Sequence, residues 1–323
     1  MRLRELYRNE KALKPWDGIP QGLLSEWIAS TEALWKELED KDLSPLEVEG
    51  TLLDPFEVDR LNDFLAGWRL VYAAGYGRFN KPTFFLAELL GTKELYDYRI
   101  HYAGKELCRD LSASMAMLQG RCIFIRLDYV KTLLWDKFQE LKGRRFGGLL
   151  KEAFSSFGIE TNEPDSPELF VRIEAVSSRV SDLFVLHELG EAYEDEHSEE
   201  WLEVLRLNKD RAAEFYMRAV KDLIADTSDM GPLRKIVETK DSALLNFQMV
   251  FMDGIRRELF PELMNSFQRF VEDGDWSVIE EARQIGYKRA ADLREHVLIL
   301  WKERKEDIVP FIKGSVSDTA FPP

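Results

Sequence analysis

The spacing of hydrophobic residues along the chain predicts a protein built mainly from α-helices. Apolar side chains recur every three or four positions, which is the period of one face of a helix. This pattern predicts long helices over residues 22–40, 129–142, 167–194, 210–226, 242–260 and 277–305, with shorter ones over 149–157, 198–205 and 262–271. The fold class that follows is mainly α, a multi-helix, bundle-like protein.

Local signals mark where several of these helices begin. Ser166-Pro167 is typical of an N-cap followed by proline at the first helical position, where the missing N–H costs nothing. Ser44-Pro45 and Asp54-Pro55 carry similar signals, each with a glutamate three residues after the first member. From the apolar residues that follow Asp54, we expect a helix that continues to about Ala74.

Between residues 95 and 128 the hydrophobic pattern changes. Two stretches, YDYRIHYAGKEL and GRCIFIRLD, are rich in β-branched and aromatic residues with partial alternation. They predict two short strands, and the segment DLSASMAMLQG between them is either helix or loop. We therefore expect one small antiparallel β hairpin near residues 95–128 in an otherwise helical protein.

Glycine and proline gather in residues 142–166, which makes this segment the best candidate for a domain boundary. The predicted organisation is an N-terminal helical region with the small hairpin at 1–145, a C-terminal helical region at 146–313 and a flexible tail at 314–323. Helices also pack across such loops, so a single compact domain is the alternative.

Composition narrows the classes of partner. Hydrophobic residues make up 45% of the chain and charged residues 32%, as in an ordinary globular protein, and the net charge is −15. Because nucleic acids and anionic membranes are bound through lysine and arginine, this balance argues against both partners. We expect no membrane span. The two cysteines, Cys108 and Cys122, favour the reducing cytoplasm.

The candidate chemistry is concentrated in residues 184–197, FVLHELGEAYEDEH. The apolar stripe that begins at Leu169 continues to His187 and then Glu191, which lie one helical turn apart and should face the core. A core-facing carboxylate needs a partner, because burying an unpaired charge is costly. This pattern predicts a divalent-metal or acid/base site on the helix 167–194.

The predicted ligands of a divalent metal ion are His187, Glu191, Glu194 and His197, and Glu188 is the candidate catalytic base. Acidic residues around a histidine suit zinc, manganese or iron. Further ligands could come from other helices, and the candidates are Glu214, Asp222 and Asp253.

The sequence from His187 to His197 partly resembles the HExxH signature of zinc metallopeptidases and its longer form HExxHxxGxxH. The resemblance implies that His187 is a zinc ligand, Glu188 is the general base and His197 is the third ligand. Glu191 stands where the second histidine belongs, and Glu194 replaces the glycine. These two departures keep us from assigning the chain to that family.

A second, weaker candidate is an anion-binding site in GYGRFNKPTFF, residues 75–85. Two glycines and the cations Arg78 and Lys81 precede Pro82, which is expected to open a helix through Leu90. A helix N-terminus beside cations favours a bound anion. The alternative is a surface turn that happens to carry two cations.

Two functions remain open at this point, and an enzymatic role is undecided between them. In the first, the protein binds a divalent metal ion or performs metal-dependent hydrolysis at His187 and Glu191. In the second, it is a non-catalytic helical interaction protein whose acidic segment, residues 188–203, contacts a protein partner or a second copy of the chain. Acidic runs are usually solvated, and His187 could equally be a hydrogen-bonded core histidine.

Overall fold

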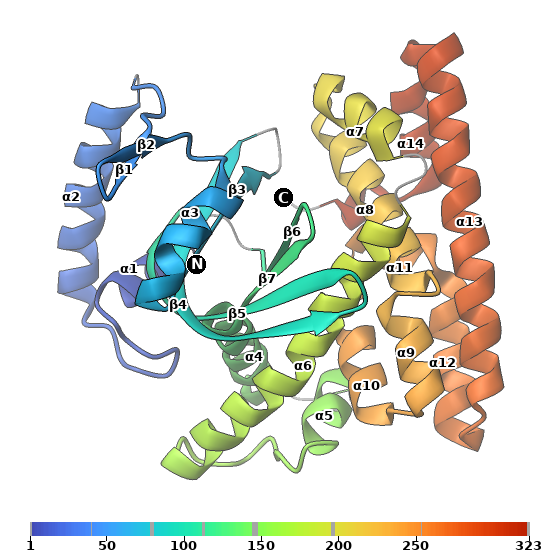
Figure 1. Cartoon of the computed structure of the whole chain (residues 1–323). Helices are drawn as coiled ribbons and strands as arrows, with labels where there is room; N and C mark the ends of the chain where they lie inside the picture. Colours follow the sequence, from blue (N-terminus) through green and yellow to red (C-terminus); the bar gives the residue numbers. More distant parts are fainter. Residues whose placement is uncertain are drawn as a thin grey trace. The chain divides into compact units, whose positions relative to one another are not determined.

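The computed structural model describes residues 2–39, 41–77, 81–111, 114–143, 148–194, 198–252 and 254–321. The chain forms two compact units (Figure 1). Unit 1 comprises Met1–Gln139 and Ile173–Ser181, and unit 2 comprises Glu140–Arg172 and Asp182–Pro323. Helices predominate, which confirms the prediction of a mainly α protein. The β structure is larger than predicted, because it contains a five-stranded sheet and a separate two-stranded sheet.

Unit 1 holds all the described strands and the helices that precede and follow them. Its elements are α1 (Arg2–Glu10), α2 (Gln21–Leu38), β1 (Leu46–Val48), β2 (Thr51–Leu53), α3 (Val58–Leu65), a 3-10 turn at Ala66–Trp68, β3 (Leu70–Tyr76), β4 (Pro82–Leu95), β5 (Tyr98–Arg109), β6 (Ala116–Gln119), β7 (Cys122–Arg126) and α4 (Leu127–Lys142, whose last turn belongs to unit 2).

The five-stranded sheet has the strand order β3-β4-β5-β7-β6. The two strands that the sequence predicts near 95–128 exist as β5 and β7, but they pair in parallel. The prediction of one antiparallel hairpin there is therefore wrong. Their antiparallel partners are β4 and β6, which the sequence pattern did not identify as strands.

The helix predicted from Asp54 to about Ala74 is much shorter than expected. It ends in the turn at Ala66–Trp68, and Arg69 then adopts a left-handed conformation with φ of 55°. The following residues, LVYAAGY, form β3, because every one of them has a partner on β4. Likewise, the residues after Ser44-Pro45 form the β1–β2 hairpin, whose turn at Glu49 and Gly50 has positive φ at both positions.

The helix predicted from Pro82 to Leu90 is also absent, since these residues belong to β4. Thr83, Phe85 and Ala87 are buried, whereas the residues between them are more exposed. This period of two is characteristic of a strand with one face in the core. Proline is accepted at the first residue of a strand.

The sheet is strongly curled, and irregular pairing is part of the cause. The register between β4 and β5 shifts at three places between Leu86 and Gly91. Such bulges bend a strand and increase its twist. The curl brings the two edge strands together, because Cε of Met117 on β6 lies 3.6 Å from the position that a Cβ of Gly75 on β3 would occupy.

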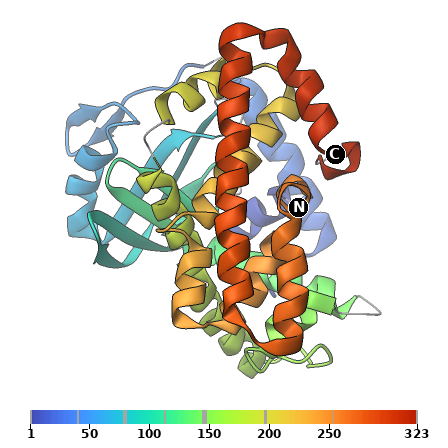
Figure 2. The ribbon, with the colours of Figure 1, turned by 90° about the vertical axis from the view of Figure 1, so that its right-hand side faces the viewer.

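All the described secondary-structure elements of unit 2 are helices. Its longest helix, α13, runs the length of the unit with α12 packed alongside (Figure 2). The elements are α5 (Gly148–Ser155), α6 (Pro167–Tyr193, whose middle belongs to unit 1), α7 (Ser198–Leu207), α8 (Arg211–Thr227), α9 (Pro232–Thr239), α10 (Ser242–Phe251), α11 (Gly254–Leu259), α12 (Pro261–Asp273), α13 (Trp276–Glu303), a 3-10 turn at Lys305–Asp307, α14 (Ile308–Ser315) and a 3-10 turn at Asp318–Ala320.

The predicted helix 242–260 is divided into α10 and α11. Met252 ends α10 in an extended conformation, and Gly254 starts α11 with φ of +50°, a value that favours glycine. Arg256, on α11, places its guanidinium near Asp222 and Asp226 on α8.

A buried arginine on α13 forms a hydrogen bond with the end of α8. Arg283 donates to the carbonyl oxygen of Thr227 at 2.5 Å, and it donates twice to the carboxylate of Glu280 at 2.8 and 2.9 Å. The hydrogen bonds from Arg283 outweigh the effect of burial and lower the pKa of Glu280 to about 2. The ionised form of Glu280 is therefore favoured by folding.

We expect Glu280→Gln to lower the free energy of unfolding by about 2 kcal/mol at pH 7. Because the folded-state pKa lies below the unfolded value near 4.5, this contribution is complete above about pH 4.5 and decreases as the pH falls toward 2. Urea unfolding at pH 7, 5, 4 and 3.5 measures it. Glu238→Gln, which removes a more exposed partner of Arg234, is the control and should change stability by less than about 0.5 kcal/mol. An equal effect of Glu280→Gln at every pH would contradict the linkage.

Candidate functional site

Helix α6 supplies the first two side chains of the site. The Ser166 hydroxyl accepts a hydrogen bond from the backbone N–H of Leu169, so the helix begins where its cap predicts. The apolar stripe that starts at Leu169 is buried along its length. His187 and Glu191 continue it, with side chains 20% and 14% exposed. Both point inward, as the stripe predicts.

Helix α8 supplies two more side chains of the site. Asp222 and Asp226 lie four residues apart, so they occupy the same side of the helix one turn from each other. The side chain of Asp226 is 3% exposed and that of Asp222 is 35% exposed. Asp210 caps this helix by accepting a hydrogen bond from the N–H of Ala213. Each helix thus contributes an i, i+4 pair of polar side chains.

A glycine allows the two pairs to meet. A Cβ atom at Gly190 would lie 2.3 Å from the carbonyl oxygen of Ala225, which is closer than side chains approach a backbone. Gly190 precedes Glu191 and Ala225 precedes Asp226. The backbones of α6 and α8 are therefore in direct contact beside the four polar residues.

The imidazole of His187 lies at the centre of the group. Its Nδ1 is 2.7 Å from Oδ1 of Asp226, and its Nε2 is 3.5 Å from Oε1 of Glu191 and 4.0 Å from Oδ1 of Asp222. A carboxylate can only accept, so Nδ1 carries the proton of this hydrogen bond. In the neutral imidazole, Nε2 then has its lone pair directed toward two carboxylates.

Two cations complete the surroundings. Nζ of Lys221 lies 2.6 Å from Oε2 of Glu191. A guanidinium nitrogen of Arg256 lies 3.5 Å from Oδ2 of Asp226 and 4.0 Å from Oδ2 of Asp222. Each carboxylate therefore places one oxygen near His187 and the other near a cation.

These neighbours determine the protonation of the group. Burial disfavours a charged imidazole, but the carboxylates of Asp226 and Glu191 outweigh it and raise the pKa of His187 well above its usual value. Burial would also raise the pKa of Glu191, yet Lys221 and His187 hold it well below its usual range. Burial, followed by the charge of Glu191, raises the pKa of Glu188 to about 7. Without a bound cation, His187 is therefore an imidazolium paired with carboxylates.

Three ligand atoms meet closely enough to hold a metal ion. One atom each from His187, Glu191 and Asp222 lie within 4.8 Å of one another, and all three residues are partly buried. The set contains one imidazole nitrogen and two carboxylate oxygens. This combination suits zinc, manganese or iron.

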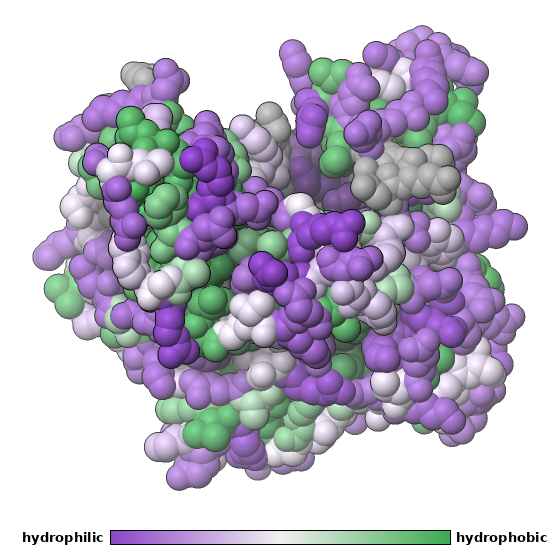
Figure 3. Space-filling view, in the orientation of Figure 1, coloured by the Kyte–Doolittle hydropathy of each residue, from purple (hydrophilic) through white to green (hydrophobic). Residues whose placement is uncertain are grey.

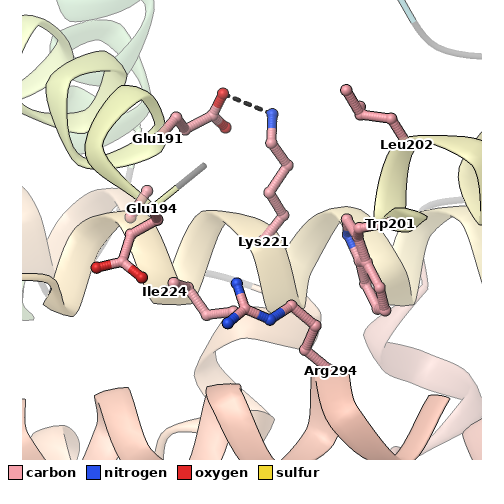
Figure 4. A pocket seen from close by; sticks show the side chains of 8 residues that line it. Glu191, Glu194, Trp201, Leu202, Lys221, Ile224 and Arg294 are labelled. Carbon is pink, nitrogen blue, oxygen red and sulfur yellow. Dashed lines mark hydrogen bonds and ion pairs between the residues drawn. The ribbon is translucent and has the colours of Figure 1, made fainter. Parts of the chain in front are cut away.

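A small cavity of about 30 Å³ adjoins this group. Figure 4 shows the Lys221 ammonium meeting the Glu191 carboxylate over a space that Glu194, Trp201 and Arg294 also line. Trp201 Nε1–H and Arg294 Nε–H are buried and have no hydrogen-bond partner among the described residues. A space of this size holds water or a single small acceptor group, which would satisfy donors of this kind.

Comparisons with known proteins give a family but no biochemical precedent. Residues 1–126 match the N-terminal domain, and residues 131–319 the C-terminal domain, of a family of unknown function, DUF6866. The chain belongs to the DUF6866 family. All the site residues described above lie in the part that matches the C-terminal domain of DUF6866. No curated protein and no solved structure matches the chain. No helix in the described part of this DUF6866 chain is long and apolar enough to cross a membrane.

The structure brings only some of the predicted site residues together. His187 and Glu191 are adjacent, and Glu188 lies next to them on α6. Glu194 accepts a hydrogen bond from the hydroxyl of Tyr287 at 2.8 Å and is not in the group of three ligand atoms. His197 lies outside the described residues.

The helix that the predicted anion-binding site required, from Pro82 to Leu90, is a strand in the structure. Lys81 is exposed and precedes a strand, since Pro82 begins β4. Arg78 lies outside the described residues. Without a helix N-terminus at Pro82, the backbone offers no dipole for an anion there.

Sequence reasoning named Asp222 as one of three candidate ligands from other helices, but it missed Asp226, Lys221 and Arg256. Of the other two candidates, Glu214 is buried and pairs with Arg218 at 3.0 Å, and Asp253 lies outside the described residues. The available signal was the Asp-x-x-x-Asp spacing of Asp222 and Asp226, which repeats the spacing of His187 and Glu191 on a second amphipathic helix.

Proposed function

We propose that this protein binds a divalent metal ion through His187, Glu191 and Asp222. The observation that carries the proposal is the hydrogen bond between Nδ1 of His187 and the buried carboxylate of Asp226. Histidines that bind metals commonly donate their second ring N–H to a carboxylate, which fixes the tautomer and the ring orientation. Asp226 would act in this way and is a positioning residue.

The distances between the ligand atoms support a shared ion. Two atoms that each lie about 2.1 Å from a tetrahedral metal ion are about 3.4 Å apart. Nε2 of His187 is 3.5 Å from Oε1 of Glu191 and 4.0 Å from Oδ1 of Asp222. Small side-chain movements would bring the three atoms to one ion.

Three protein ligands leave at least one coordination position open, as in catalytic rather than structural zinc sites. The neighbouring cavity, with the donors of Trp201 and Arg294, offers room for water or a substrate oxygen beside Glu191. A metal ion with an open position activates a bound water or polarises a substrate oxygen. We therefore propose metal-dependent hydrolysis as the reaction class.

The second hypothesis, an acidic partner surface over residues 188–203, has less support. Glu191 pairs with Lys221, and Glu194 accepts a hydrogen bond from Tyr287, so neither carboxylate is available to an external partner.

A related proposal concerns the location of the protein in the cell. Cys108 and Cys122 are both free thiols, which agrees with the cytoplasm.

The test is a metal titration of the untagged protein after treatment with EDTA. We expect one equivalent of zinc or manganese per chain by calorimetry, with a competing chelator to set the free metal concentration. His187→Ala should weaken binding by more than about 100-fold, and Asp226→Asn by about 10- to 100-fold. Asp226→Asn tests the orienting role, because the ligand atoms themselves are unchanged.

His296→Ala is the matched control, since His296 lies on α13 of the same unit and packs against Phe311. It should bind metal as the wild type does. Absence of a stoichiometric zinc, manganese or iron(II) ion in the wild type would overturn the proposal, as would unchanged binding in His187→Ala. In either case the group would be an ion-pair network with a structural role.

A further inference from the structure

A second, larger cavity lies within unit 1. Its volume is about 520 Å³, which falls in the range of sites for small organic molecules. It is independent of the metal site, because its lining residues all belong to the part of the chain that matches the N-terminal domain of the family.

The floor of the cavity is one face of the curled sheet. Tyr72 pairs with Leu86, and Ala74 pairs with Phe84, so these four side chains form two adjacent rungs across β3 and β4. Cys108 on β5 pairs with Leu86 and extends the rung formed by Tyr72 and Leu86. Directly paired residues point to the same side of a sheet, which explains how they line one space.

Helix α3 and the β1–β2 hairpin form the walls. Leu61 and Leu65 contribute from α3, and Leu46 and Val48 contribute from β1. Leu43, just before the hairpin, also lines the cavity and has an exposed fraction of 58%. Figure 3 shows hydrophobic residues gathered at the surface over this part of unit 1. Apolar side chains thus continue from the floor to the mouth.

The lining is unsuited to water and to anions. Aliphatic and aromatic residues dominate it, and Glu47, which is exposed, is its one charged residue among those described. An apolar cavity does not hold ordered water well, because water needs two to four polar partners. A buried carboxylate would find no cation among these lining residues and would pay the full cost of desolvation.

A largely buried tyrosine also faces this apolar space. Tyr72 lines the cavity and is 8% exposed, and its hydrogen bonds with Asn62 are made by its backbone N–H and C=O. Burial raises the pKa of Tyr72 to about 12, so the hydroxyl stays neutral and can donate. The hydroxyl can therefore donate a hydrogen bond to an acceptor oxygen of a ligand in the cavity.

We infer that this cavity binds an uncharged, mainly apolar small molecule that places one acceptor oxygen at the Tyr72 hydroxyl. The apolar body lies on Ala74, Phe84 and Leu86 under the hairpin. An uncharged chain with a single oxygen, such as a long-chain alcohol, has this chemistry, whereas a fatty acid anion does not.

The test uses the full chain in the metal-free form, so that its outcome does not depend on the metal site. The neutral fluorophore N-phenyl-1-naphthylamine reports occupancy, and dodecanol and dodecanoate compete with it. We expect dodecanol to displace the fluorophore at a concentration at least about tenfold lower than dodecanoate, and Tyr72→Phe to weaken dodecanol binding by about fivefold.

A filling variant and a chemical probe locate the binding. Ala74→Phe should reduce fluorophore binding at least tenfold, whereas Leu107→Phe, at an exposed position on β5 outside the lining, should not. In a Cys122→Ser protein, dodecanol should slow the alkylation of Cys108 by N-ethylmaleimide, because Cys108 lines the cavity and Cys122 does not. This measurement needs no change to the cavity itself.

Three results would overturn the inference. They are failure of both fluorophore and dodecanol to bind the wild type, an alkylation rate of Cys108 that dodecanol leaves unchanged, and binding of dodecanoate equal to that of dodecanol. The last result would exclude the uncharged ligand class.

Discussion

Replacement of Glu106 by alanine is expected to lower the free energy of unfolding of unit 1 by about 3–5 kcal/mol. Glu106 on β5 receives two hydrogen bonds from Arg126 at the end of β7, at 2.6 and 2.9 Å. Arg126 is fully buried, and its guanidinium also lies over the rings of Phe85 and Tyr129. Removing the carboxylate would leave a guanidinium charge in the core without its main counter-charge, which is the costly event.

The measurement is denaturant unfolding of Glu106→Ala beside a control at Glu94. Glu94 on β4 pairs with Arg99 on β5 at 2.8 Å, but both side chains are more than half exposed. Glu94→Ala should cost less than about 1 kcal/mol. The double replacement Glu106→Met with Arg126→Met should be less damaging than Glu106→Ala, because no charge then remains buried. Equal effects of Glu106→Ala and Glu94→Ala would refute the burial argument.

Replacement of Gly190 by alanine is expected to destabilise unit 2 by about 3 kcal/mol. The added Cβ would lie 2.3 Å from the carbonyl oxygen of Ala225, and a backbone atom cannot move aside as a flexible side chain can. Helices α6 and α8 must then separate beside His187 and Asp226. We therefore also expect metal binding to weaken by about tenfold or more, because the orienting hydrogen bond lengthens.

Gly314→Ala is the matched control for this prediction. Gly314 lies in helix α14 of the same unit, and a Cβ there would meet nothing within 4 Å. Alanine is the better helix former, so this change should stabilise the protein by up to about 1 kcal/mol. Thermal and urea unfolding of the two variants give the comparison. Stabilisation by Gly190→Ala would show that the helices tolerate a wider spacing.

Much of unit 2 could be predicted from local signals. The cap at Ser166 and the stripe from Leu169 define α6, and α13 begins and ends within two residues of the predicted range 277–305. Each of these helices satisfies its own backbone hydrogen bonds, so its limits depend on residues close in sequence. The break between α10 and α11 was missed, although Gly254 was an available sign of it.

The sheet was harder to predict because strands depend on partners distant in the sequence. Pro82 followed by apolar residues suits a helix, yet these residues bond to β3 and β5. The β-branched and aromatic residues Thr83, Phe84 and Phe85 were the signal that favoured a strand. The parallel pairing of β5 with β7 cannot be deduced from either strand alone, since a strand with the same side-chain pattern can pair in parallel or antiparallel.

The residues of the candidate site also differ in how far local sequence predicts them. His187 and Glu191 could be predicted to face inward, because one helix carries both and the stripe that precedes them. Asp226 could not be identified as the partner of His187, because the choice of neighbouring helix depends on the contact of Gly190 with Ala225. Helix positions follow from local sequence, whereas the pairing of two helices depends on how closely their surfaces can approach each other.

The curl of the five-stranded sheet has a consequence for behaviour at high concentration. Exposed edge strands offer unpaired N–H and C=O groups to other chains and can start aggregation. Here the edges are β3 and the four-residue β6, and Met117 of β6 lies against Gly75 of β3. Each edge therefore obstructs access to the other, as in a barrel that is nearly closed. A flatter sheet of the same sequence would leave both edges open to strand addition.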